Sequence, residues 1–119
     1  MTDTHTTAAA EKIWAGLVEG AEGGTYATDG EALPTTGFVV GGVSNSLINP
    51  RTFEEVHAYC LRLAHAGLLG FWLDKITGNY HIDGCTWHVN RANALGVARR
   101  RGELAIFDVI AGAEVPVTY

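Results

Sequence analysis

The chain has 119 residues, of which 47% are hydrophobic, and 13 acidic against 8 basic side chains give a formal net charge of -5. A chain of this length folds as one domain and buries roughly two thirds of the surface that it exposes when unfolded. The acidic balance disfavours nonspecific binding to nucleic acid or anionic membrane, because both depend on cations that neutralise phosphate. We therefore expect a single domain over residues 1–119 that folds without metal or disulfides.

The cysteine content and the first residues of the chain indicate a cytoplasmic protein. Two cysteines, Cys60 and Cys85, do not make a disulfide framework, so we expect two reduced thiols. The N-terminus lacks the basic and apolar regions of a signal peptide. No apolar run approaches the roughly 20 residues of a membrane helix, so we expect no membrane association.

One helix is predicted near the N-terminus. Residues 1–6 are polar and are expected to be loose. Thr6 or Thr7 can cap a helix that runs to about Glu19, with apolar residues on one face, and Gly20 ends it.

A long segment rich in glycine follows that helix. Residues 21–37 show little periodicity and predict a long loop, with a short strand near 25–27. Loops of this length in small domains are often functional. Residues 37–43 predict a buried strand that is interrupted by the pair Gly41-Gly42.

The strongest signal in the sequence is that of a second helix. Asn49 can cap it with Pro50 in the first helical position, or Thr52 and Glu55 can form a capping box. Apolar residues then recur at helical spacing until Gly67, where we expect the helix to end.

The C-terminal half predicts a hairpin, a third helix and two further strands. The runs 70–74 and 79–83 are rich in aromatic residues and flank a short turn with glycine, which is typical of a hairpin. Asn90 can cap a helix that three arginines and a glycine close at residues 99–102. Residues 104–110 and 114–117 predict the last strands.

Without the first helix, the predicted order is strand, helix, strand, strand, helix, strand. That order is typical of a ferredoxin-like, or split βαβ, unit. The expected fold is therefore α+β, with a mainly antiparallel sheet, two helices on one of its faces and an N-terminal helix packed separately.

Reactive side chains are densest at residues 81–88. Because side chains alternate along a strand, His81, Asp83 and Cys85 are expected on one face, with His88 three residues further on. Imidazole, carboxylate and thiolate groups are zinc ligands, and the same three groups can serve as base, orienting acid and nucleophile. A structural interpretation also accounts for these residues: they can be solvated strand residues followed by a turn at Asp83-Gly84, with no role in metal binding or catalysis. The absence of a paired metal-binding motif favours it.

Five blocks of the chain carry a resemblance to known sequences: Gly37 to Gly42, Gly70 to Asp74, Thr77 to Asp83, Ala94 to Gly102 and Leu104 to Asp108. In these blocks the chain resembles small uncharacterised proteins of actinobacteria and their phages. The predominance of arginine over lysine, six against two, is consistent with a genome of high GC content. The resemblance implies an accessory protein of a mobile element and assigns no catalytic residue.

The sequence leaves three functional hypotheses. The first is a non-enzymatic accessory protein that binds a protein partner or forms a homodimer, with the C-terminal strand available to pair across the dimer. The second is an enzyme that binds a metal, such as zinc, or a small ligand through His81, Asp83, Cys85 and His88. The third is a nucleic-acid mimic with an acidic surface. The lack of a motif with catalytic spacing favours the first, and we assign no cofactor.

Overall fold

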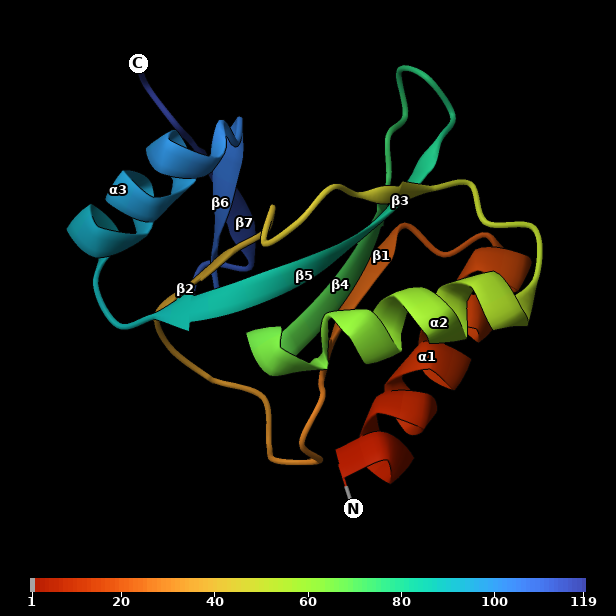
Figure 1. Ribbon diagram of the computed structural model, residues 1–119. Helices are drawn as coiled ribbons and strands as arrows, with labels where there is room; N and C mark the ends of the chain where they lie inside the picture. Colours follow the sequence, from red (N-terminus) through yellow and green to blue (C-terminus); the bar gives the residue numbers. More distant parts are fainter. Residues whose placement is uncertain (1) are drawn as a thin grey trace.

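The computed structural model describes residues 2–119, with side chains from residue 4 onward, as three α-helices, a short 3-10 helix and a seven-stranded antiparallel sheet (Figure 1). The strand order is β1-β4-β5-β2-β6-β7, and β3 pairs with β5 beside β2. The elements are α1 (Thr2–Glu19), β1 (Gly23–Ala27), β2 (Phe38–Val40), β3 (Leu47–Ile48), α2 (Phe53–Arg62), the 3-10 helix (Ala64–Ala66), β4 (Leu68–Leu73), β5 (Tyr80–His88), α3 (Arg91–Arg101), β6 (Ala105–Asp108) and β7 (Ala113–Pro116).

Strand β5 joins the two halves of the sheet. On one edge, β4 pairs with β5 from Tyr80 to Cys85. On the other edge, β3 pairs with the beginning of β5 and β2 pairs with its end. The segment between β2 and β3 follows the same edge, since the backbone N–H of Val43 donates to the carbonyl oxygen of Gly84 at 3.2 Å.

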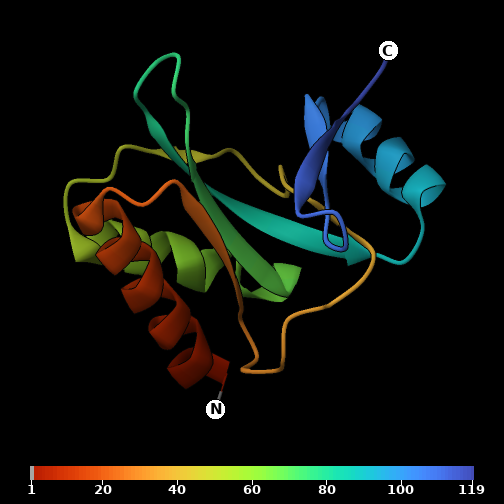
Figure 2. The same ribbon diagram turned by 180° about the vertical axis from the view of Figure 1, so that it is seen from behind.

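The helices cover one face of this twisted sheet with two apolar cores. Because residues alternate between the two faces along β5, Ile82 lies in the core with α1 and α2, and Thr86 and His88 lie on the same face, toward α3. The first core joins α1, α2, β4 and β5, and the second joins α3 with β2 and β6. Figure 2 shows the molecule from the side opposite α2.

The N-terminal helix is longer and more integrated than the sequence predicts. It begins at Thr2, and the hydroxyl of the buried Thr6 donates to the carbonyl oxygen of Thr28 at 3.3 Å. Ile13 of α1 is fully buried in the core that α1 shares with α2. The prediction of a separately packed helix is therefore wrong, and the helix begins before the predicted caps at Thr6 and Thr7. The expectation of a loose segment over residues 1–6 stays a prediction, and position 1 lies outside the described residues.

The other two helices begin at the predicted residues. The Thr52 hydroxyl accepts from the backbone N–H of Glu55 at 3.2 Å, which is one of the two hydrogen bonds of the predicted capping box. Asn90 caps α3 in the same way. The alternative cap at Asn49 is not used, because its side chain accepts from the backbone N–H of Tyr80 instead. None of the helices within residues 2–119 is both long and apolar enough to cross a bilayer.

The α+β class and the antiparallel sheet are confirmed, whereas the ferredoxin-like order is not. All neighbouring strands are antiparallel, so β2 and β5 do not form the parallel central pair of a split βαβ unit. The reason is that β2, the following loop and β3 run along one edge of β5 in a single antiparallel direction. Residues 21–37, predicted as a loop with a short strand, contain the five-residue edge strand β1.

Candidate functional site

The four predicted metal ligands do not converge. The register of β5 places His81, Asp83 and Cys85 on the face without helices, opposite Trp72, Gly70 and Leu68 of β4. His88 lies on the α3 side, where its Nε2 atom is 2.8 Å from the Thr86 hydroxyl. In an extended strand, alternate residues are roughly 7 Å apart, which is too far for one ion without ligands from another segment. Within the described residues, no three His, Cys, Asp or Glu side chains lie so that they could hold a metal ion.

His81 packs as an aromatic ring. It stacks on Trp72, with ring centroids 4.5 Å apart and an angle of 11° between the planes. Its Nε2 atom is buried and has no hydrogen-bond partner among the described residues. The His81 ring therefore packs against β4 as an aromatic group.

Asp83 lies in a polar cluster at the point where the two halves of the sheet meet. It is 8% exposed, and its Oδ1 atom accepts a hydrogen bond from the Ser46 hydroxyl. Glu103, in the loop between α3 and β6, also approaches this cluster beside Gly41. A Cβ atom on Gly41 would lie 3.1 Å from Oε1 of Glu103 and 3.6 Å from Oδ2 of Asp83. The two carboxylates therefore share the space that the missing side chain of Gly41 leaves open.

Arg101 holds the end of β2 at this cluster. Its Nη1 atom donates to the carbonyl oxygens of Val40 and Gly41, at 3.2 and 3.0 Å. Burial and the nearby Asp83 raise the pKa of Glu103, and Arg101 offsets part of that rise. We call Gly41, Ser46, Asp83, Arg101 and Glu103 the polar junction.

Sequence reasoning found only part of the polar junction. It singled out Asp83 and the glycine pair and placed Arg101 at the end of a helix, but it assigned no role to Ser46 or Glu103. The available signal was the glycine pair after β2, which marks a place where other groups approach the backbone closely.

The raised pKa of Glu103 predicts a pH-dependent effect of Glu103→Gln. The folded chain disfavours the ionised carboxylate of Glu103, so this group destabilises the wild-type fold at pH values above the ordinary carboxyl pKa. As the pH falls, Glu103 becomes protonated in both the folded and the unfolded state, and the penalty disappears. Glu103→Gln should therefore stabilise the fold at pH 7 and lose its advantage toward pH 4. Urea unfolding across this range checks the result; an advantage that grows on acidification would contradict it.

Neither cysteine has the environment of a nucleophile. Cys85 is buried, its thiol donates weakly to the Asp83 carbonyl oxygen at 3.6 Å, and burial together with Asp83 and Glu103 raises its pKa to about 12. Burial alone raises the pKa of Cys60 to about 12. Both thiols are protonated at neutral pH, and thiol catalysis needs the thiolate.

Thiol labelling tests this conclusion directly. At pH 8, Ellman's reagent should leave both Cys60 and Cys85 of the native protein unmodified, and it should label both after unfolding in guanidinium chloride. Cys85→Ser should remove one of the two equivalents seen after unfolding. Rapid labelling of native wild-type protein that is lost in Cys85→Ser would show a reactive thiol and contradict the structure.

The face of the sheet without helices exposes a row of apolar side chains. In the register, Val39 lies between Trp87 of β5 and Phe107 of β6. Trp87 and Phe107 are each 41% exposed, while Val39 is half-buried between them. The indole N–H of Trp87 donates to the Thr36 carbonyl oxygen at 2.7 Å, which fixes that ring. We call Trp87, Val39 and Phe107 the aromatic row.

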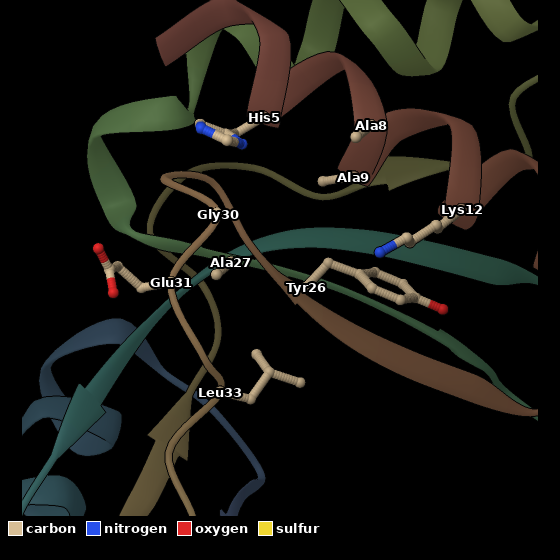
Figure 3. Close-up of a pocket in the computed structure, with 9 residues that line it drawn as sticks. All are labelled: His5, Ala8, Ala9, Lys12, Tyr26, Ala27, Gly30, Glu31 and Leu33. Carbon is tan, nitrogen blue, oxygen red and sulfur yellow. The ribbon is translucent and has the colours of Figure 1, made fainter. Parts of the chain in front are cut away.

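A groove of about 290 Å³ lies between α1, β1 and the loop after β1 (Figure 3). Lys12 of α1, Tyr26 and Ala27 of β1 and Leu33 of the loop are among the residues that line it. The Lys12 ammonium lies 5.8 Å from the centre of the Tyr26 ring, in a cation–π contact. We call this the α1–β1 groove. A smaller groove of about 200 Å³ lies beside Trp87, and neither groove includes the polar junction.

Comparison with known proteins assigns no relative to the chain. No protein-family model matches it, and no curated protein or solved structure matches it significantly. Its function must therefore be argued from its own surfaces.

Proposed function

We propose that this protein is a non-enzymatic binding protein that recognises another protein through the sheet face that carries the aromatic row. The observation behind the proposal is that Trp87 and Phe107 remain 41% exposed on either side of Val39, where no helix covers the sheet. Neighbouring aromatic side chains that are already ordered lose little entropy on binding and are enriched among the residues that dominate binding energy. The protonated thiols and the position of the polar junction outside both grooves favour binding over catalysis.

The structure favours a different chain over a second copy paired through β7. The backbone N–H of Val117 donates to Leu104, so alternate residues of β7 direct their backbone groups away from β6. Pro116 falls at such an outward position and has no N–H to offer. A proline at the free edge protects a strand from pairing, which argues against the dimer predicted from the C-terminal strand.

We infer from the sequence resemblance that the protein serves a mobile element, such as a phage, as an accessory factor in the cytoplasm. The link to a mobile element rests only on the resemblance of those blocks to small actinobacterial and phage proteins, and the cytoplasmic location rests on the two cysteines expected as reduced thiols and on the N-terminal residues. A gene location outside any mobile element would contradict that link.

A capture experiment with matched variants tests the binding proposal. Immobilised wild-type protein, Phe107→Ser and Ile76→Ser are exposed to a lysate of an actinobacterium. Ile76 is 97% exposed in the β4–β5 turn and serves as an apolar control outside the aromatic row. We expect a stoichiometric partner on the wild type and on Ile76→Ser that is lost from Phe107→Ser.

Two outcomes would overturn the proposal. One is the absence of a stoichiometric partner, or a partner that Phe107→Ser retains. The other is a concentration-dependent dimer in sedimentation velocity that Phe107→Ser abolishes, because a second copy would then occupy the aromatic row. Circular dichroism of each variant establishes that the fold is retained.

The polar junction favours a second candidate, binding or acid–base chemistry on a small ligand. Asp83 and Glu103 approach the same position beside Gly41 in unequal environments, and such carboxylate pairs can divide the roles of acid and base. In a fragment screen followed by ¹⁵N NMR, shifts at Gly41 and Ser46 that Glu103→Gln abolishes would support this candidate. A screen with no shifts at these amides would count against it.

A further inference from the structure

The outer edge of β1 has unpaired backbone groups. The N–H of Leu73 donates to the Glu22 carbonyl oxygen at 2.9 Å, and the N–H of Thr28 donates to the Gly67 carbonyl oxygen at 3.0 Å. Because hydrogen-bonded pairs alternate in an antiparallel ladder, the residues between them with odd numbers direct their N–H and C=O groups away from β4. These residues are Gly23, Thr25 and Ala27.

The two edges of the sheet differ in how they are protected. At β7, an outward position is taken by Pro116, which has no donor. At β1, each outward residue retains its N–H, and nothing else in the sheet pairs with the strand. An edge of this kind is a template for a further strand.

The α1–β1 groove lies beside this edge and can receive side chains from an added strand. Figure 3 shows α1 running above β1, with the side chains of Ala8 and Ala9 directed toward the groove. A strand paired with β1 would direct every second side chain into the groove. The remaining side chains would lie on the face without helices, where Trp72 is the register partner of Gly23 and is 45% exposed.

The charges at the groove indicate which side chain it would take. Lys12 contacts the Tyr26 ring and has no carboxylate partner, since the one salt bridge among the described side chains joins Lys75 to Glu22. An acidic side chain entering beside Lys12 would complete an ion pair. The alanines of α1 and Leu33 offer an apolar surface to another side chain of the same added strand. Glu31, on the loop, would repel an acidic side chain placed at that end of the groove.

A second copy of the chain fits this edge poorly. Two copies that paired through β1 would be related by a two-fold axis perpendicular to the sheet, so both α1 helices would lie on the same side of the joined sheet. Each helix already lies over its own β1, and a groove of about 290 Å³ does not hold a second helix. An extended peptide needs far less width.

We propose that β1 binds an extended segment of another protein as an added antiparallel strand, with an acidic side chain beside Lys12 and an apolar side chain against the alanines of α1. The inference rests on the binding role in the proposed function and adds a second contact, at the β1 edge and separate from the aromatic row, together with the chemistry of the segment that it takes. Backbone hydrogen bonds to Thr25 and Ala27 hold the segment, and the α1–β1 groove selects its sequence.

A displayed library of random peptides tests the proposal, with Thr25→Pro and Thr25→Ala as a matched pair. Thr25 makes no backbone hydrogen bond to β4, so the proline removes an outward donor and no hydrogen bond of the sheet, whereas the alanine keeps that donor. We expect wild-type protein to enrich peptides that alternate apolar and acidic residues. Thr25→Pro should bind them roughly tenfold more weakly, and Thr25→Ala should bind them like the wild type.

Charge reversal at Lys12 supplies an independent arm. Lys12→Glu should change the enriched residue at one peptide position from acidic to basic and leave the apolar positions unchanged. No enrichment with the wild type, equal binding by Thr25→Pro, or a consensus that Lys12→Glu leaves unchanged would each overturn the proposal. Should Thr25→Pro unfold, Ala27→Pro removes the next outward donor and replaces it in the test.

The result of the peptide-library test can be distinguished from the result of the capture experiment. A natural partner that Thr25→Pro retains and Phe107→Ser loses would leave the proposed function standing and overturn docking at β1. A library consensus that depends on Thr25 and Lys12 would support docking at β1 even where the aromatic row proves dispensable.

Discussion

Ile82→Ala is expected to lower the free energy of unfolding by about 2–5 kcal/mol. Ile82 is fully buried near the beginning of β5, where it lies between Phe71 of β4 and Leu47 of β3 and packs toward α1 and α2. Truncation removes apolar contacts to both helices at once. Because strands hold the backbone on either side, the surrounding groups can move only a little to fill the cavity.

The matched control is Ile76→Ala, which deletes the same atoms from a side chain that is 97% exposed. It should change the free energy of unfolding by less than about 0.5 kcal/mol. Urea unfolding of the two variants and the wild type, with unchanged m-values, measures the difference. Equal effects of the two substitutions would mean that Ile82 is not in the core that the structure describes.

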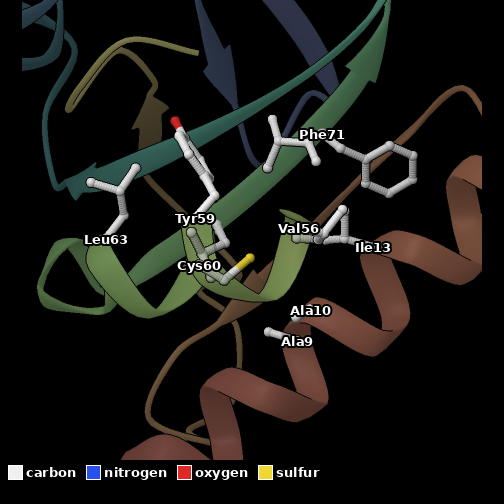
Figure 4. Close-up of a cluster of buried hydrophobic side chains, with 10 residues drawn as sticks. Ala9, Ala10, Ile13, Val56, Tyr59, Cys60, Leu63 and Phe71 are labelled. Carbon is white, nitrogen blue, oxygen red and sulfur yellow. The ribbon is translucent and has the colours of Figure 1, made fainter. Parts of the chain in front are cut away.

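Gly16→Ala is expected to destabilise the protein although it improves the helix propensity of α1. Gly16 is buried, and a Cβ atom there would overlap the ring of Phe71. Figure 4 shows the Phe71 ring directed toward α1 on the same side as Ile13. Overpacking costs about 1–3 kcal/mol, whereas replacing a helical glycine gains about 1 kcal/mol. The net change should be a loss, because Phe71 is itself buried and cannot swing away.

Gly96→Ala is the control for the propensity term. It lies inside α3, where the nearest atom to an added Cβ is Nη1 of Arg100 at 3.6 Å, an ordinary contact. The substitution should therefore raise the free energy of unfolding by about 0.5–1 kcal/mol. Thermal and urea unfolding of both variants give the signs. If Gly16→Ala stabilised the protein as much as Gly96→Ala, the close contact between α1 and β4 would be contradicted.

The parts of the fold that sequence determined are those whose signals are local. Thr52 and Glu55 lie within one helical turn of each other, so the start of α2 could be found without knowing its surroundings. Asn90 and the left-handed Gly102, with φ of 73°, likewise begin and end α3. The hairpin of β4 and β5 follows from two strands joined by a short turn, in which the Asp74 side chain accepts from the backbone N–H of Ile76.

Pairing between distant segments could not be found in this way. Strand β3 has two residues and carries no periodicity of its own, and it exists because the chain after β2 continues along β5. The burial of Thr6 depends on Thr28, which the β1–β4 pairing brings under α1. The direction of β2 against β5, which excludes the ferredoxin-like order, is also a property of that pairing and not of either strand alone.

The candidate sites divide in the same manner. The shared face of His81, Asp83 and Cys85 follows from the period of a strand, so sequence alone was enough to place it. Which residues of other segments contact those side chains depends on the long-range pairing of the sheet. The fold brings Ser46 and Glu103 to Asp83 and leaves His81 stacked on Trp72.

Exposure was decided by tertiary structure as well. Sequence marked Trp87 and Phe107 as large apolar residues, which are ordinarily buried, and the placement of all three helices on the opposite face leaves them partly open. Sequence could not distinguish the β1 edge from the β7 edge until the register fixed which backbone groups face outward. Local chemistry thus determined the starts of α2 and α3 and the β4–β5 hairpin, whereas the binding surfaces arise from long-range pairing, which sets what each element leaves uncovered.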